Sequence, residues 1–270
     1  MVLSKPFQIE VELPPPDERL VAPGTPYEMY DGELVHVPPA DRPHGERHSR
    51  VSGLIEACVR PEFSVAIDVL TRTSRTSDIA PDITIWPRAL DPVTGRQRIA
   101  ELAFEVVSTQ SLDNAADKAR RLVARGVRRV FAIDVESGWA LEWSEEQDAW
   151  QRYPGTSIDD PVLAVPLPVL PLARAMSIDD AMARALVAKN NPVIAAEKAE
   201  SRRQGRREGV MEGVLEGVRR ALLQLLAARG VALDPADRSR ILGERDLQRL
   251  ERWFSRAANG ASLADILADP

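Results

Sequence analysis

Apolar and polar residues alternate near the start of the chain in a way that predicts a β-hairpin followed by an amphipathic helix. The segment YEMYDGELVHV alternates around Asp31-Gly32, a dipeptide that readily supplies the two positive φ angles of a tight hairpin turn. In HGERHSRVSGLIEACV the apolar residues recur at helical offsets, and Pro61 follows as a stop signal. We therefore expect a hairpin and then a helix.

Strand patterns dominate the middle of the chain. SVAIDVL, DITIWP and ELAFEVVS are rich in β-branched and aromatic residues, which suit a pleated surface. The next segment, LDNAADKARRLVARG, has helical spacing, and Gly126 is its expected left-handed cap. RRVFAID and WALEW have the pattern of two further strands. Together these segments predict an α/β fold.

Helix-forming residues replace the strand patterns from about Asn190 onward. Within this tail, glycine recurs at every fourth residue, and valine follows three of these glycines in the same register. Each glycine costs a helix about 1 kcal/mol relative to alanine, so the repeat favours close approach of a partner helix, with a solvated linker helix as the alternative. The residues are Gly205, Gly209, Gly213, Gly217, Val210, Val214 and Val218.

The chain is expected to divide into an N-terminal arm (1–24), a core domain (25–189) and a helical tail (190–270). The most apolar stretch, PVLAVPLPVLPLARAM, lies before this tail and is interrupted by three prolines. Since each proline leaves backbone groups unpaired in a bilayer, a membrane span is excluded and an extended strap on the core is expected.

Charge and cysteine content limit the possible partners and location. The 270 residues carry a formal charge of −6, which argues against a protein coated with basic surface and leaves only a local patch for phosphate binding. The single cysteine, Cys58, falls in the apolar stripe of the first helix, and no secretory signal is visible at the start. Both features predict a cytoplasmic protein.

Two carboxylates stand where apolar residues are expected. Glu105 lies inside ELAFEVVS, on the same strand face as Ala103 and Val107, and Asp82 opens the strand DITIWP. A carboxylate on a buried strand is costly unless it is paired or binds a metal. We therefore regard Asp82 and Glu105 as candidate ligands of a hard cation such as Mg²⁺ or Mn²⁺.

A lysine on the following helix completes a candidate hydrolytic site. Projected around the helix, Lys118 falls at the margin of the apolar stripe formed by Ala119 and Leu122, whereas Asp117 points away. A lysine at such a margin buries its stem and brings its ammonium towards the sheet. Two carboxylates and a lysine can hold a metal ion, polarise a phosphoryl oxygen and orient water.

The motifs YEMYDGELV, PDITIW, FEVVS and DKARRLVARGVRRVFAID resemble those of the Uma-two (Uma2) family, a branch of the PD-(D/E)XK nuclease superfamily, over about residues 25–175. The resemblance implies a restriction-endonuclease-like core with a central mixed sheet flanked by helices. It also implies that Asp82 and Glu105 hold the metal and that Lys118 is the catalytic lysine. The superfamily usually places this lysine two residues after the acid, where this chain has Val107, so Lys118 is expected to fill that space from the helix.

Further candidates are acids and histidines near these motifs. Glu33 matches a recurrent acid of the family's opening motif, and a solvent-facing hairpin glutamate is the alternative. Asp68 in SVAIDVL is a second candidate acid. His44 and His48 are four residues apart, which suits zinc on one helix face, but no third ligand is evident, so no zinc site is expected. His48 is expected to pack in the helix stripe or to contact substrate.

Residues 118–129, KARRLVARGVRR, contain six basic residues and no acidic one. Arg121, Arg125 and Arg128 are therefore expected to contact DNA phosphates, with a solvated basic helix as the alternative.

These features together predict a metal-dependent DNA endonuclease that forms a homodimer through its C-terminal helices. A non-catalytic protein of the same fold, acting in nucleic-acid binding or as an assembly subunit, is the alternative. A glycosidase with a carboxylate pair is disfavoured by Lys118 and the basic run.

Overall fold

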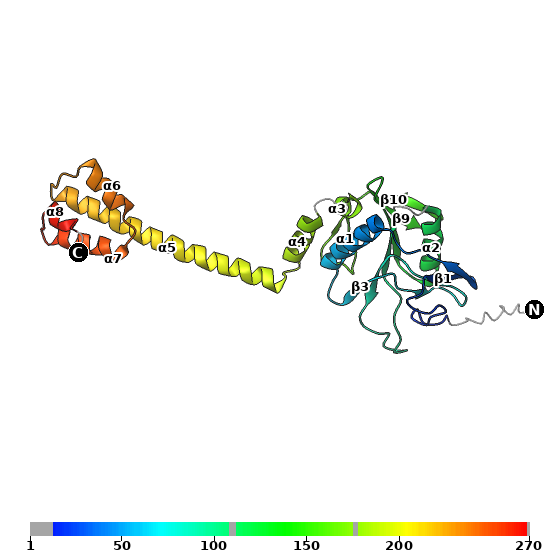
Figure 1. The fold of residues 1–270 in the computed structure, drawn as a ribbon. Helices are drawn as coiled ribbons and strands as arrows, with labels where there is room; N and C mark the ends of the chain where they lie inside the picture. Colours follow the sequence, from blue (N-terminus) through cyan, green and yellow to red (C-terminus); the bar gives the residue numbers. More distant parts are fainter. Residues whose placement is uncertain (1–12, 108–111, 175–177, 269–270) are drawn as a thin grey trace, which may run out of the picture. The chain divides into compact units, whose positions relative to one another are not determined.

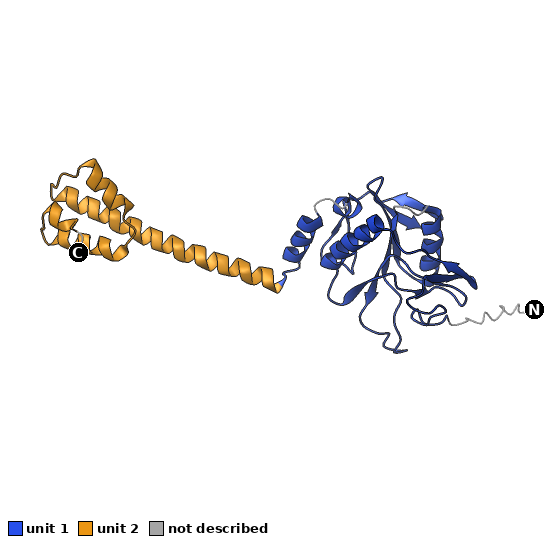
Figure 2. Cartoon of the chain, in the orientation of Figure 1, with its two compact units in different colours: residues 1–191 blue, residues 192–270 orange. Residues whose placement is uncertain are grey.

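The computed structural model describes residues 13–107, 112–174 and 178–268. Two compact units divide the chain, residues 1–191 and 192–270, and they are called unit 1 and unit 2 below (Figure 2). The division lies two residues beyond the boundary expected from composition. Whether these parts are independent folding domains stays a prediction.

Unit 1 is built around a mixed six-stranded sheet, as the sequence predicts (Figure 1). Its strand order is β10-β9-β8-β7-β6-β3. Strands β7 and β8 are parallel and enclose helix α2 in the chain, whereas the other neighbours are antiparallel. The strands are β3 (Phe63–Ile67), β6 (Ile83–Pro87), β7 (Leu102–Val107), β8 (Arg129–Asp134), β9 (Trp139–Ser144) and β10 (Ala149–Arg152).

Helices cover both faces of this sheet (Figure 1). On one face α1 (Arg42–Cys58), α3 (Val169–Arg174) and α4 (Ile178–Ala188) share an apolar core with alternate residues of β7, among them Phe104 and Val106. On the other face α2 (Leu112–Arg125) packs on the intervening residues, such as Ala103. The predicted alternation along β7 is confirmed, and it directs Glu105 to the α2 face.

A second sheet of order β2-β1-β5-β4 carries the predicted hairpin. Its turn contains Asp31 at φ 50° and Gly32 at φ 90°, the two positive φ angles that the dipeptide predicts. Strand β1 lies between β2 and β5, so β2 is an edge strand with four exposed residues. The strands are β1 (Tyr27–Tyr30), β2 (Glu33–His36), β4 (Thr71–Arg72) and β5 (Asp78–Ile79).

The proline-interrupted stretch is extended only in part. It pairs as β12 (Leu167–Pro168) with β11 (Ser157–Ile158), but α3 then follows, which the expectation of an extended strap missed. Pro171 falls in the first turn of α3, where a missing backbone N–H costs no hydrogen bond. Leu167 and Leu172 are fully buried in the core of unit 1.

Unit 2 is helical. The long helix α5 (Pro192–Ala228) contains the glycine repeat and is followed by α6 (Pro235–Gly243), α7 (Leu247–Ala258) and α8 (Leu263–Ile266). Leu222, Leu226 and Trp253 form the centre of its apolar core. Within the described ranges, no helix combines the length and apolarity needed to cross a membrane.

Truncation of Phe104 is expected to destabilise unit 1 strongly. Its ring is fully buried and stacks on Phe131 with 5.2 Å between the ring centroids. Phe104→Ala should lower the free energy of unfolding by about 3–5 kcal/mol, because it removes apolar contacts and leaves a cavity. Val93→Ala, at a side chain that is 90% exposed, is the control and should change it by less than about 0.5 kcal/mol. Urea unfolding measures both; equal losses would contradict the assigned core.

Candidate active site

Helix α2 directs Lys118 inward. Its buried face contains Ala115, Ala119 and Leu122, and only 8% of Lys118 is exposed. The Asp117 side chain is 41% exposed and pairs with Arg121 on the outer surface. This is the sidedness expected from the helical projection, and it brings an ammonium group into the interior of unit 1.

Polar atoms from several elements surround the Lys118 ammonium. Nζ donates hydrogen bonds to Glu28 Oε1 at 3.2 Å and to the Ala80 carbonyl at 2.7 Å. Glu105 Oε2 lies 4.0 Å from Nζ. Burial lowers the pKa of Lys118, but the carboxylates of Glu105 and Glu28 outweigh it and raise the pKa above its ordinary value. The lysine is therefore charged.

The hairpin acid beside Lys118 is Glu28, which corrects the expectation for Glu33. Glu28 is 3% exposed and also accepts a hydrogen bond from the Tyr30 hydroxyl at 2.6 Å. Glu33 is exposed on β2. The physical reason is strand order, because β1 lies inside the sheet and β2 forms its edge.

Asp82 and Glu105 are cross-strand neighbours. Ile83 of β6 pairs with Phe104 of β7 in antiparallel register, so the preceding and following residues, Asp82 and Glu105, face each other one step further along. Such neighbours have Cβ atoms about 4.5–5.5 Å apart. Asp82 is 5% exposed and Glu105 is fully buried. The two acids therefore meet where the pairing of β6 with β7 begins, and Lys118 lies beside Glu105.

Glu105 is buried at an electrostatic cost. Within the described part of the chain neither carboxylate oxygen has a hydrogen-bond partner of good geometry. Burial raises the pKa of Glu105 well above its ordinary value; the Lys118 charge opposes this effect, and the carboxylates of Asp82 and Glu28 add to it. A further cation beside Glu105 would favour its charged form.

Asp82 is, by contrast, well compensated. Its Oδ2 accepts a hydrogen bond from the Val106 N–H at 2.6 Å and lies 3.1 Å from His48 Nε2. Burial raises the pKa of Asp82, but His48, Lys118 and the Val106 N–H outweigh it and lower the pKa. Burial lowers the pKa of His48 and Asp82 reverses this, so the net shift is upward. His48 thus belongs to the cluster through Asp82.

Two further residues of the sequence analysis border this cluster. The Asp68 N–H donates to the Asp82 carbonyl at 3.2 Å, and burial raises the pKa of the Asp68 carboxyl, with the His48 charge opposing. His44 lies beside His48, with 4.6 Å between their ring centroids. Asp82 joins the two histidines as a third potential metal ligand, which the sequence spacing alone did not reveal.

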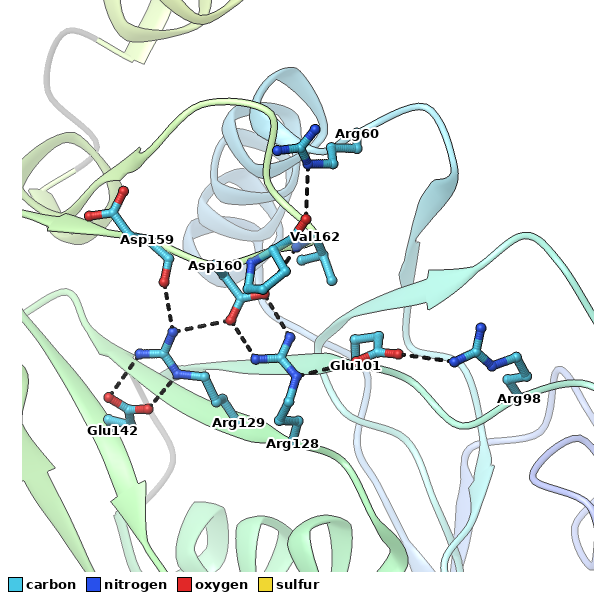
Figure 3. A network of polar contacts seen from close by, with 10 residues as sticks. Arg60, Arg98, Glu101, Arg128, Arg129, Glu142, Asp159, Asp160 and Val162 are labelled. Carbon is cyan, nitrogen blue, oxygen red and sulfur yellow. Dashed lines mark hydrogen bonds and ion pairs between the residues drawn. The ribbon is translucent and has the colours of Figure 1, made fainter. Parts of the chain in front are cut away.

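Arg128 is held by acids from other elements, which favours a structural role over the predicted phosphate contact (Figure 3). It forms a bidentate pair with Asp160 at 2.6 and 2.7 Å and approaches Glu101 at 3.3 Å. Arg129 reaches the same Asp160 carboxylate at 3.2 Å and pairs with Glu142. Because the Asp160 side chain is 1% exposed, it depends on these arginines for its charge balance.

Arg121 and Arg125 also have intramolecular partners. Arg121 pairs with both oxygens of Asp31 in the hairpin turn, at 3.0 and 2.8 Å, and with Asp117. Arg125 donates to the carbonyls of Arg72 and Pro14. These contacts tie α2 to other elements of unit 1. Contact with DNA phosphates stays a prediction for these arginines.

The acid pair suits a hard divalent cation. Mg²⁺ and Mn²⁺ prefer carboxylate oxygens, and both Glu105 oxygens lack a well-formed hydrogen bond within the residues described. A cation between Glu105 and Asp82 would offset the burial of Glu105. The residues present therefore fit the metal that the sequence analysis expects.

A family profile and a solved structure are similar to this chain. The profile of the family Uma2, described as "Putative restriction endonuclease", matches residues 13–177. A crystal structure of a "putative nuclease belonging to DUF820" from Anabaena variabilis is 14% identical, with a TM-score of 0.43, and the match covers 54% of this chain and 89% of that one. No curated protein matches the chain.

Glu105→Gln is expected to stabilise the protein at neutral pH. The folded-state pKa of Glu105 lies above its unfolded value of about 4.3, so its contribution to stability falls as pH rises through and above that value. Glutamine cannot ionise, and Lys118 keeps Glu28 as its partner. The free energy of unfolding should exceed the wild-type value by about 1–2 kcal/mol near pH 7.5 and equal it near pH 4.

Urea unfolding at the two pH values measures this difference. Glu62→Gln, at an exposed glutamate, is the matched control and should show no pH-dependent gain. A Glu105→Gln protein less stable than the wild type near pH 7.5 would contradict the electrostatic cost assigned to Glu105.

Proposed function

Since the chain belongs to the Uma2 family, which is described as "Putative restriction endonuclease", we propose that it is a metal-dependent DNA endonuclease that hydrolyses phosphodiester bonds. One observation carries the proposal: a charged, buried lysine adjoins a cross-strand pair of buried carboxylates, Asp82 and Glu105. Neither acid is needed to pair the lysine, which already has Glu28 at 3.2 Å.

Asp82 and Glu105 would hold Mg²⁺ or Mn²⁺. Such a cation, when bound, polarises a phosphoryl oxygen and lowers the pKa of water. The hydrogen bond from the Val106 N–H to Asp82 fixes the direction of that carboxylate. Glu105 lies within strand β7, so the position of this carboxylate does not depend on a loop.

Lys118 would orient the attacking water or stabilise charge that develops on the phosphate. Its ammonium is directed by Glu28 and the Ala80 carbonyl, and its stem is buried along α2. Holding the charge in a fixed position reduces the reorganisation required during the reaction. Within this proposal Glu28 is a positioning residue, and Tyr30 fixes Glu28 in turn.

Among Arg121, Arg125 and Arg128, Arg121 is the best candidate for a contact with a DNA phosphate. It pairs with the hairpin turn that follows β1, the strand that carries Glu28, and its side chain is 22% exposed. His48 would act beside the metal ligand Asp82, which its imidazole contacts. A cytoplasmic location is also part of this proposal.

A non-catalytic nuclease-fold protein is the second candidate. The observation that favours it is the satisfaction of Lys118 by Glu28 and Ala80, since a buried structural ion pair has the same contacts. In that case Lys118 would join β1 to α2 without taking part in hydrolysis. Activity measurements separate the two candidates.

Substitution of either acid is expected to abolish cleavage of plasmid DNA. Asp82→Asn and Glu105→Gln should each lower the rate with Mg²⁺ or Mn²⁺ by about 10²-fold or more, because each removes a ligand charge. Lys118→Met alone would leave buried carboxylates uncompensated, so Glu28→Gln/Lys118→Met is the variant that tests the lysine. Gel analysis of nicked and linear plasmid measures the rates, with a chelator as negative control.

The exposed Glu62→Gln variant should cleave at the wild-type rate. Because the site acts as a unit, Asp82→Asn/Glu105→Gln should be little slower than either single variant. Absence of wild-type cleavage across several metals and DNA forms would favour the non-catalytic candidate. Full activity in the Glu28→Gln/Lys118→Met protein would remove Lys118 from the mechanism.

We also propose homodimerisation through the middle of α5, at residues 205–217. Val210, Met211 and Val214 are 63%, 53% and 43% exposed, and added Cβ atoms at the four repeat glycines meet nothing within 4 Å among the described residues. Val218, which follows the glycine repeat in the same register, instead packs within unit 2, as do Leu222, Leu225 and Leu226, so the proposed surface is shorter than the repeat suggests. Two subunits would supply the two sites needed to cut both strands.

Leucine at Gly209 and Gly213 is expected to weaken the dimer. The larger side chains would separate helices that approach along the glycines, although leucine favours a helix by about 1 kcal/mol per position. Glu208→Leu, at an exposed position on the side of α5 away from both the glycines and Val210, is the control. Light scattering over a concentration series measures the dimer fraction; an unchanged fraction in Gly209→Leu/Gly213→Leu would exclude the glycine face as the interface.

A further inference from the structure

Two histidines and an aspartate converge at the α1 side of the acid cluster. His44, His48 and Asp82 each offer one ligand atom, and these atoms lie within 4.8 Å of one another. The residues are only 7%, 8% and 5% exposed. Two buried imidazoles beside a buried carboxylate form a ligand set that differs in chemistry from the Asp82–Glu105 pair.

The local structure orients both imidazoles. His44 and His48 are one turn apart on α1, so they share a face of the helix. Asp41 caps this helix by accepting the His44 N–H at 2.9 Å, and Pro43 lies in the first turn, where its fixed φ suits a helix. The first turn is therefore held rigidly, although it lies at a helix end.

The geometry approaches that of a metal centre. A tetrahedral ion with bonds of about 2.0–2.1 Å separates its ligand atoms by about 3.3 Å. His48 Nε2 and Asp82 Oδ2 are 3.1 Å apart, and the ligand atom of His44 lies within 4.8 Å of both. Small rotations of the His44 side chain would therefore complete three ligands around one ion.

The donor atoms of this group include two nitrogens and one oxygen. His48 Nε2 lies 3.1 Å from Asp82 Oδ2, and the imidazole of His44 adds a second nitrogen near the same carboxylate. Imidazole nitrogen is a good ligand for Zn²⁺ and other late first-row ions such as Co²⁺, whereas Mg²⁺ and Mn²⁺ favour oxygen. The donor set thus distinguishes between classes of cation.

We propose that His44, His48 and Asp82 form a binding site for a divalent transition-metal ion. Zn²⁺ and Co²⁺ bind there more tightly than Mn²⁺, and Mn²⁺ more tightly than Mg²⁺. Asp82 is shared with Glu105, so the histidines set the metal preference of the acid cluster. Only the effect on cleavage rests on the proposed nuclease function; binding of the ion does not.

Cobalt binding to the full-length protein tests the site directly. Chelator-treated protein is titrated with Co²⁺ and followed by visible absorption, and Zn²⁺ binding is measured by calorimetry. Wild type is expected to bind Co²⁺ with bands typical of nitrogen ligation. His44→Gln and His48→Asn should weaken Co²⁺ binding at least about tenfold, as expected for lost ligand interactions. His36→Asn, at an exposed histidine on β2, is the matched control and should bind as wild type.

Two further measurements distinguish failure of the histidine metal site from failure of the proposed nuclease function. Glu105→Gln should retain histidine-dependent Co²⁺ binding, because Glu105 does not belong to this ligand set. The ratio of Mn²⁺-supported to Mg²⁺-supported cleavage should fall in His44→Gln. Cobalt binding without cleavage by the wild type under any metal would support the site and refute the proposed nuclease.

Equal Co²⁺ affinities for wild type, His44→Gln and His48→Asn would overturn the proposal, whatever the cleavage results. Circular dichroism establishes that each variant is folded. His44→Gln carries the test if His48→Asn unfolds, because the contact of His48 with Asp82 also contributes to stability.

Discussion

The buried ammonium group of Lys118 is the constraint on which the arrangement of unit 1 depends. It joins α2 to β1 through Glu28, to the segment before β6 through the Ala80 carbonyl, and to β7 through the charge of Glu105. A buried charge without such partners costs several kcal/mol, so these elements must assemble around the lysine together. Without this cation, both the hairpin and the acid pair would lose their compensating charge.

The three acids near this lysine differ in how many hydrogen bonds and ion contacts their carboxylates make. This difference distinguishes acids with a structural role from a candidate functional acid. Glu28 has both Lys118 and the Tyr30 hydroxyl, and Asp82 has the Val106 N–H and His48. Glu105 is fully buried with no comparable hydrogen bond among the described residues. Folding alone gives no reason to keep an ionisable group there, since an apolar residue would be cheaper. The proposed role of Glu105 as a metal ligand would explain why an ionisable residue occupies this buried position.

Local periodicity was sufficient to predict the parts of the site that lie on single elements. Alternation along β7 places Glu105 on the α2 face, and the helical projection distinguishes Lys118 from Asp117. The hairpin acid was not predictable in this way. Its turn follows from Asp31-Gly32, but choosing Glu28 over Glu33 requires knowing that β5 pairs with β1, which makes β2 the edge strand. Pairing between distant strands leaves no signal in local periodicity.

The same limitation applies to charges and metal ligands. The basic run around α2 suggests a phosphate-binding surface. In the folded chain, however, Arg128 pairs with Asp160 and Arg121 pairs with Asp31, both of which are distant in the sequence. Conversely, the sequence around His44 and His48 offers no third metal ligand. The fold supplies one, because the segment before β6 places Asp82 beside these histidines. Asp82 is therefore the residue through which the imidazoles and Glu105 affect each other. If Asp82 takes part in both proposed sites, a cation beside the histidines would reduce the negative charge that Asp82 offers to a cation beside Glu105. We therefore expect metal binding at the two proposed sites to be coupled through this carboxylate.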